Sequence, residues 1–166
     1  MIRQRVPADL DNCVRALQAV HDADGYPVNW PADPGRWLNP PGTLAAWVFA
    51  DPQIGGHVLV SSASEPAPAG AASSAGEPMA GEVGRLFVAP SHRGRGIGLG
   101  LLTRVREWAV ARRLGLVLEV VDDSRGAAIA LYERTGWTYT GTSAADWTGP
   151  VGEPVRVRHY SLPLPG

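Results

Sequence analysis

Lysine is absent from this sequence, and all fifteen of its basic residues are arginine. The phosphate-binding P-loop carries a lysine directly after its last glycine, so the sequence excludes that motif. Cysteine is nearly absent as well, and the single Cys13 excludes an intramolecular disulfide and a zinc cluster built on cysteine ligands. No apolar run approaches the roughly 20 residues of a membrane-spanning helix, which argues against an integral membrane protein.

A strong charge of either sign is also missing. The chain has a net charge of −1 at pH 7 and a pI near 6.4, which gives no reason to expect nucleic acid or a membrane surface as a partner. The first residues, MIRQRVPADLDN, contain no hydrophobic core of a signal peptide. We therefore expect a cytoplasmic protein, and the sequence leaves a homodimer open.

What is present favours one domain over 1–166, because hydrophobic residues make up 45% of the chain and charged residues 19%. Apolar periodicity and turn residues predict an α/β fold, in which helices flank a mixed β-sheet. The low-complexity segment at 61–80 is expected to be a flexible insertion in a β-hairpin. In chain order we expect a strand at 1–6, a helix at 8–25, a helical turn around Gly35–Leu38, strands at 43–51, 55–62 and 82–90, a helix at 96–115, a strand at 116–121, a helix at 125–136 and two further strands.

Glycines at positions 94, 96, 98 and 100 mark the junction between the strand at 82–90 and the helix after it. A strand, a glycine loop and a helix in this order point several free backbone N–H groups at one place, at the positive end of the helix dipole. Such a junction favours an anion, and a pyrophosphate fits it. The dinucleotide fingerprint G-x-G-x-x-G fails because Leu99 or Leu101 stands at its last glycine. The pattern that remains is R-x-x-G-x-G, formed by Arg93, Gly96 and Gly98.

The stretch LFVAPSHRGRGIGLGLL resembles the acetyl-CoA-binding motif of the GNAT family of N-acetyltransferases, and AAIALYERTGW resembles the second motif of that family. A strand separates the two motifs, as in the family, and the resemblance covers Glu82 to Trp137. It implies a sheet that splays apart between its two middle parallel strands, at 82–90 and 116–121. It also implies that acetyl-CoA is a co-substrate and that a small molecule or peptide with a primary amine accepts the acetyl group.

The resemblance further implies which residues hold the coenzyme. Backbone N–H groups of the loop would bind the pyrophosphate, and Leu86, Phe87 and Val88 would pair their backbone with the pantetheine arm as an added strand does. The family often has an asparagine six residues before the leucine of the LY pair; here that position is Arg125, so Ser124 and Arg125 are the candidates for this coenzyme contact. The loop residues expected to contact the coenzyme are Arg93, Gly94, Arg95, Gly96, Ile97, Gly98 and Leu99.

Acetyl transfer requires a base for the amine and a proton for the departing thiolate. Tyr132 matches the tyrosine that lies near the thioester sulfur in the family, and we expect it to supply that proton. Glu82 is the candidate base, acting directly or through water, and a solvated residue at the end of a strand is the alternative reading. Glu119 is a lesser candidate for the site, and Asp122 is expected to cap the next helix.

Histidine and cysteine are expected to play structural roles. His57 is predicted to be buried, His92 to be exposed, and Cys13 to belong to the core, because direct transfer needs no covalent intermediate. The histidines and acidic residues lack metal-ligand spacing, so no metal is expected.

The acceptor site is predicted from aromatic residues in the N-terminal third. Tyr26, Trp30 and Trp37 are the candidates for a pocket that binds an apolar or cationic amine, with core anchors of a proline-rich loop as the alternative. Two other functions stay open from the sequence: a non-catalytic acyl-CoA sensor, and a transferase of a larger acyl group.

Overall fold

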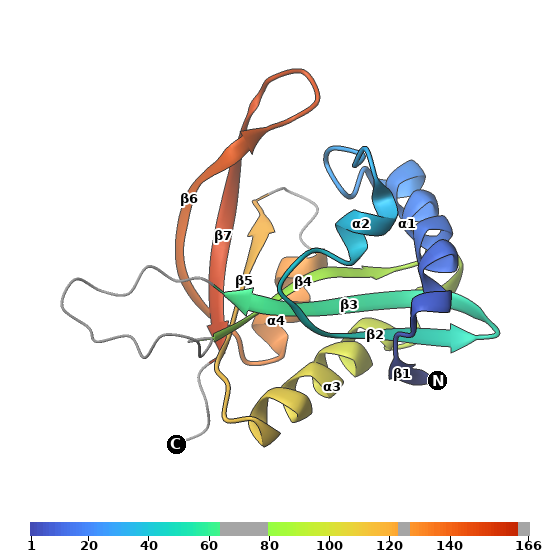
Figure 1. Ribbon diagram of the computed structural model, residues 1–166. Helices are drawn as coiled ribbons and strands as arrows, with labels where there is room; N and C mark the ends of the chain where they lie inside the picture. Colours follow the sequence, from blue (N-terminus) through green and yellow to red (C-terminus); the bar gives the residue numbers. More distant parts are fainter. Residues whose placement is uncertain (64–79, 123–126, 163–166) are drawn as a thin grey trace.

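Seven strands form one mixed sheet in the computed structural model, which describes residues 1–63, 80–122 and 127–162 (Figure 1). The strand order is β1-β2-β3-β4-β5-β7-β6, and the first four strands are antiparallel neighbours. The strands are β1 (Ile2–Gln4), β2 (Thr43–Asp51), β3 (Gln53–Ala63), β4 (Ala80–Val88), β5 (Leu116–Val121), β6 (Thr138–Thr148) and β7 (Pro154–Leu162). The α/β class and the order of elements predicted from the sequence are confirmed.

Helices cover both faces of this sheet. The helices α1 (Leu10–Asp24) and α2 (Pro34–Leu38) lie on one face, and α3 (Ile97–Ala111) and α4 (Ala127–Arg134) lie on the other (Figure 1). Short 3-10 turns precede α1 at Pro7–Asp9 and follow β4 at Pro90–His92. None of the helices in the described ranges is long and apolar enough to cross a membrane.

Each face has its own apolar core. On one face, Trp47, Val58 and Val83 of the sheet pack with the buried side of α3 and with Tyr132 and Tyr160. On the other face, α1 and α2 pack on a second cluster, whose buried members are Cys13, Ala16, Leu17, Val20, Leu38, Val48, Ile54, Phe87 and Ala89. The sheet is thus held between two cores, and polar groups at its middle are shielded from water on both sides.

The two parallel middle strands pair only at one end. β4 and β5 are in register at Gly81 with Leu116 and at Glu82 with Val117, and at no later residue of either strand. β5 continues instead along β7, from Leu116 to Val121. Within the described residues, the border of β4 that faces β5 therefore has no strand partner from Val83 to Val88, which opens the sheet as the sequence resemblance predicted.

A bulge in β4 accompanies this opening. His57 of β3 pairs with Phe87 and Leu59 pairs with Gly84, so β4 carries one extra residue between them. Arg85 takes up the distortion with a φ of 53°, in the left-handed region that side chains rarely adopt. The bulge bends β4 at the place where its partnership with β5 has just ended.

A buried histidine holds the bulge. His57 is fully buried, its Nδ1 lies 2.9 Å from the carbonyl oxygen of Arg85, and its Nε2 lies 2.8 Å from Nη1 of Arg5. A carbonyl only accepts and a guanidinium only donates, so Nδ1 carries the proton and the ring is neutral. Burial is the main reason that the pKa of His57 falls to about 4. The predicted structural role of His57 is confirmed.

Arg5 extends this arrangement to the helix on the other side. Its guanidinium also donates to the carbonyl oxygen of Leu38 at 2.6 Å and to Oδ1 of Asn39 at 2.7 Å. Burial is the main reason that the pKa of Arg5 is lowered. Arg5 therefore ties the C-terminal end of α2 to the bulge of β4.

Two local expectations were wrong. The helix expected at 96–115 ends at Ala111, and Arg113 shortly beyond its end has a φ of 54°, in the left-handed region. His92 was expected to be exposed and is buried, with its ring packed so tightly over Gly55 that a Cβ there would come within 2.4 Å of it.

Candidate active site

The glycine loop lies where β4 passes into α3. Gly94 and Gly96 have φ values of 80° and 74°, and a Cβ at either position would meet open space. Gly96 is the residue before the first turn of α3, whose leading N–H groups have no partner within the helix. These two glycines are therefore required by the backbone conformation, and the space beside them is free for a ligand.

Gly98 lies at a place where the neighbouring side chains leave little room for a Cβ. A Cβ on Gly98 would lie 3.2 Å from a side-chain carbon of Leu131 and 3.8 Å from one of Val88. Gly98 therefore lets α3 approach α4 and the end of β4 closely. Its neighbour Ile97 is buried in the core, whereas Leu99 is about half exposed.

The two arginines of the loop are already engaged by the protein. Arg93 forms an ion pair with Asp24 at the end of α1, and its Nε donates to the carbonyl oxygen of Val88 at 3.3 Å. Arg95 lies 4.0 Å from Asp51 in an exposed pair. The side chains of the loop thus contact α1 and the β2–β3 turn, which is compatible with the prediction that its backbone N–H groups are the ones that bind an anion.

The strand residues expected along the coenzyme alternate between the two cores. Leu86 and Val88 pack against the core under α3, and Phe87 belongs to the cluster under α1. Their side chains are therefore directed to the two faces of the sheet. Their backbone on the border toward β5 has no strand partner, so an extended ligand can pair with it.

Tyr132 lies on α4 in the core beneath the open border of the sheet. Its ring contacts Trp137 and Tyr160 at centroid distances of 6.0 and 6.1 Å. The hydroxyl of Tyr132 has no hydrogen-bond partner within the described residues. Every fully buried polar side-chain atom of those residues does have such a partner. The hydroxyl is therefore reached by solvent. Burial, with a smaller contribution from Tyr26, raises the pKa of Tyr132, so the hydroxyl keeps its proton at neutral pH.

Glu82 sits at the last paired position of β4 before the strands separate. Burial is the main cause of its raised pKa, and the nearby carboxylate of Glu119 raises it further. Arg85 and His159 act in the opposite direction. The structure thus brings Glu119, a lesser candidate from the sequence, to the same region as Glu82. His159 was missed, because only the pairing of β5 with β7 places it opposite Glu119.

Tyr26, Trp30 and Trp37 lie against the core cluster under α1. The face of Trp37 is covered by the guanidinium of Arg85, 3.9 Å from the ring centroid, and Trp30 packs on His21. Burial raises the pKa of Tyr26 to about 12, and Arg85 partly offsets this. Trp37 therefore cannot offer that face to a cationic amine.

A long-range contact joins the two loops above this region. Nδ2 of Asn29, in the segment between α1 and α2, donates to the carbonyl oxygen of Thr148 at 2.8 Å. Thr148 ends β6, directly before the turn that leads into β7. The segment carrying Tyr26 and Trp30 is thus connected to the β6–β7 turn.

The remaining candidate residues either have other surroundings or fall outside the described residues. Ser124 and Arg125 fall outside the described residues, so their expected coenzyme contact stays a prediction. Cys13 is buried in the core as predicted, and burial raises its pKa to about 11, which disfavours a thiolate nucleophile. Asp122 binds Nε of Arg158 at 3.0 Å.

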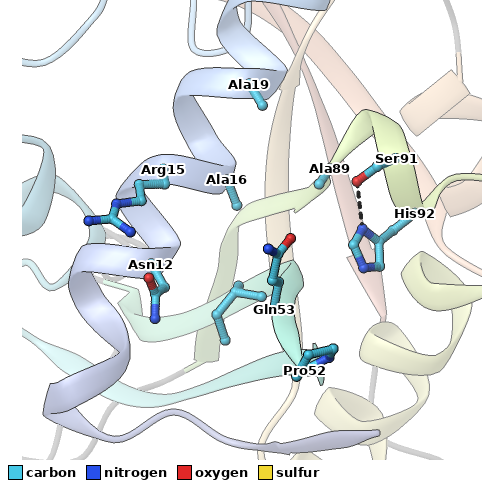
Figure 2. A pocket seen from close by; sticks show the side chains of 10 residues that line it. Asn12, Arg15, Ala16, Ala19, Pro52, Gln53, Ala89, Ser91 and His92 are labelled. Carbon is cyan, nitrogen blue, oxygen red and sulfur yellow. Dashed lines mark hydrogen bonds between the residues drawn. The ribbon is translucent and has the colours of Figure 1, made fainter.

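A hollow of about 340 Å³ opens between α1 and the start of β3 (Figure 2). Arg15 and Asn12 of α1 face Gln53 across it, and the bonded pair of Ser91 and His92, 2.8 Å apart, closes one side. None of the described residues expected at the coenzyme or acceptor site lines this hollow, although Ala89 and His92 of its lining directly adjoin Val88 and Arg93 in the chain.

Comparison with known proteins agrees with this geometry. The model of the acetyltransferase (GNAT) family matches residues 18–137, so the chain belongs to this family. The streptothricin acetyltransferase of Streptomyces lavendulae is 33% identical over 78 residues, which are 47% of this chain and 41% of that protein. The match therefore spans less than half of the length of this relative.

Solved structures share the whole fold. NAA60 of Arabidopsis thaliana, in complex with a bisubstrate analogue, superposes with a TM-score of 0.73 at 20% identity over 100% of this chain and 99% of its own. The ribosomal-protein-alanine N-acetyltransferase of Brucella melitensis gives a TM-score of 0.73 at 23% identity over 99% of each chain. At these identities the likeness establishes the fold.

Proposed function

We propose that this protein transfers the acetyl group of acetyl-CoA directly to a primary amine of a small molecule or peptide. The observation that carries the proposal is the open border of β4 between two features: the glycine loop at its end, and Glu82 at its last pair with β5. Membership of an acetyltransferase family supports it. So do the names of its relatives, which include a streptothricin acetyltransferase and a NAA60 structure in complex with acetyl-CoA.

The coenzyme fits the free backbone of this region. The pyrophosphate would accept hydrogen bonds from backbone N–H groups of Arg93–Leu99, next to the two glycines whose Cβ positions are open. The pantetheine arm would pair with the unpartnered border of β4 along Leu86, Phe87 and Val88. Bound acetyl-CoA supplies the thioester, whose carbonyl carbon is the electrophile.

The protein side of the chemistry is proton transfer. The amine must lose a proton to attack, and Glu82, whose pKa is raised by burial and by Glu119, is a stronger base than an ordinary carboxylate. As the new C–N bond forms, the C–S bond breaks and the thiolate leaves. The Tyr132 hydroxyl, which is protonated at neutral pH and free of partners within the described residues, would give the thiolate its proton. A backbone N–H near Val88 would stabilise the oxyanion.

The test is release of free thiol from acetyl-CoA across a panel of primary amines, with coenzyme binding measured in parallel by calorimetry. We expect binding and turnover of at least one amine. Binding without turnover on any amine would identify an acyl-CoA sensor instead. The assay is repeated with longer acyl-CoA thioesters. A higher kcat/KM for a longer thioester than for acetyl-CoA would identify a transferase of a larger acyl group.

A further inference from the structure

Arg85 has a guanidinium whose ends the protein leaves unpaired. Its Nε donates to the carbonyl oxygen of Trp37 at 3.1 Å, and its plane stacks on the Trp37 ring. Within the described residues, no carboxylate lies within ion-pair distance of Arg85, and its two terminal nitrogens make no hydrogen bond. Every fully buried polar side-chain atom of the described residues has a hydrogen-bond partner. The two terminal nitrogens of Arg85 have none, so they are not fully buried and are open to solvent.

The environment of Arg85 is unfavourable for a positive charge. Burial is the main cause of the lowered pKa of Arg85, and the nearby Tyr26 and Glu82 compensate only in part. A half-buried cation that lacks a bound anion loses hydration without gaining an ion pair. The same residue has the left-handed φ of the β4 bulge, held by His57 through the Arg85 carbonyl. The backbone of Arg85 is thus fixed, and its side chain is fixed by Trp37, so its open donors have a defined position.

Arg85 also lies beside the groups proposed to handle the amine. Glu82 is three residues earlier on β4, which limits the separation of the two Cα atoms to roughly 10 Å. The charge of Arg85 lowers the pKa of Glu82, and Glu82 in turn raises the pKa of Arg85. The proposed base and a cation that has no ion-pair partner within the described residues therefore lie close enough on β4 to influence each other's pKa.

We propose that Arg85 binds a carboxylate of the acceptor, so that the substrate class is amines that carry a carboxylate on the same molecule. This inference rests on the proposed acetyltransferase function and adds the chemistry of its acceptor. The two terminal nitrogens of a guanidinium match the two oxygens of a carboxylate. Stacking on Trp37 fixes the orientation of the planar guanidinium and so preorganises it for that contact.

The experiment compares amine acceptors in matched pairs, each carboxylate with its primary amide, over several spacings between amine and carboxylate. The wild-type chain should show a higher kcat/KM for the carboxylate in at least one pair, by roughly 10- to 100-fold, the worth of a hydrogen-bonded ion pair. Equal rates on both members of every pair would overturn the inference and leave the acetyltransferase activity standing. Absence of transfer to all amines would instead count against the proposed function.

Variants separate recognition from a structural role. Arg85→Gln should abolish the preference, so that kcat/KM for each carboxylate falls to the value for its amide in the same variant, and Arg85→Lys should restore part of the preference. Arg36→Gln, which removes an exposed arginine of α2 one residue from Trp37, is the matched control and should keep the wild-type preference. If Arg85→Gln lowers both rates equally, Arg85 only supports Trp37, and the inference fails.

Discussion

At the scale of single residues, Tyr132 shows how a core position acquires a chemical role. Its ring is part of the apolar cluster under the sheet, while its hydroxyl is accessible and lacks a partner within the described chain. A purely structural tyrosine in such a core would be expected to have its hydroxyl bonded, as that of Tyr160 is to Glu133 at 3.0 Å. The hydroxyl of Tyr132 is therefore available to a ligand.

Tyr132→Phe should lower kcat by roughly 100-fold, the usual effect of removing a general acid. Coenzyme affinity and Tm should stay close to wild type, because the ring and its contacts remain. Stopped assays under conditions where chemistry limits the rate give kcat, and calorimetry gives the affinity. Tyr139→Phe, which alters an exposed tyrosine bonded to Thr142, is the control and should keep full activity. Full turnover of the Tyr132 variant would remove this residue from the mechanism.

His57 makes a prediction about stability against pH. The pKa of His57 is about 4 in the folded chain and near 6.5 in the unfolded chain. Between pH 4 and pH 6.5 the imidazole is therefore protonated in the unfolded chain and neutral in the folded chain. The neutral ring therefore stabilises the fold fully above pH 6.5, and this contribution is lost as the pH falls toward 4. The loss should be on the order of 3 kcal/mol.

Urea unfolding at several pH values between 4 and 7 measures this effect. His57→Asn should be less stable than wild type at pH 7, because the contacts with Arg5 and the Arg85 carbonyl change. It should also lose less stability on acidification, because asparagine does not titrate. Parallel stability curves for the two proteins would contradict the assignment of a buried neutral ring.

At the scale of elements, the start of α3 depends on glycine for its backbone rather than for space. A Cβ on Gly96 would touch nothing, but its φ of 74° is unfavourable for any other residue. Gly96→Ala should cost about 1 kcal/mol of stability, and should weaken coenzyme binding because the N–H groups of the loop turn away.

The matched control is Gly115→Ala, at a glycine that also has open space but no left-handed φ. Calorimetry with coenzyme A should show weaker binding for the Gly96 variant alone. If the Gly96 variant binds coenzyme A as tightly as the Gly115 variant, the anion is held elsewhere.

Local sequence signals were sufficient to predict most elements. Alternating apolar residues and turn residues placed the strands, and the prolines around 31–41 left room for only a short helix, found at Pro34–Leu38. The end of α3 was misplaced: the helix ends at Ala111, and the residue shortly beyond it with a left-handed φ is Arg113 rather than a glycine. His92 was misjudged because its burial depends on Gly55, which is distant in sequence and gives the ring room.

The site was less predictable than the fold, for the same reason. The glycine loop and Tyr132 lie in continuous motifs, whereas the contacts that shape β4 join Arg5, His57 and Arg85 across separations of 52 and 28 residues. His159 has no local signal at all and reaches the region of Glu82 only through the pairing of β5 with β7. Such contacts depend on the tertiary fold, which single-sequence periodicity does not encode.

At the scale of the whole molecule, we expect that the fold does not need the low-complexity insertion. The residues 64–79 lie outside the described structure, and β3 and β4 pair directly on either side of them, with Ala63 opposite Ala80. Replacing 64–79 by a two-residue Asn–Gly turn should keep Tm and coenzyme affinity close to those of the parent, because that turn suits a hairpin with this register. A marked drop in thermal unfolding temperature or in affinity would show that the insertion packs on the domain. The cytoplasmic location and a homodimer remain predictions of the sequence.

The open border of β4 has a consequence for solubility. An unpaired strand edge is a template on which other chains can add strands and aggregate. Here the edge lies inside the molecule: β5 begins beside it, and α1 with α2 and α3 with α4 cover the two faces (Figure 1). A thin extended chain can enter and pair there, whereas a full polypeptide strand, with its side chains and its own neighbours, meets the surrounding elements. If the coenzyme pairs with this edge as proposed, the same covering elements would hinder strand addition by other proteins.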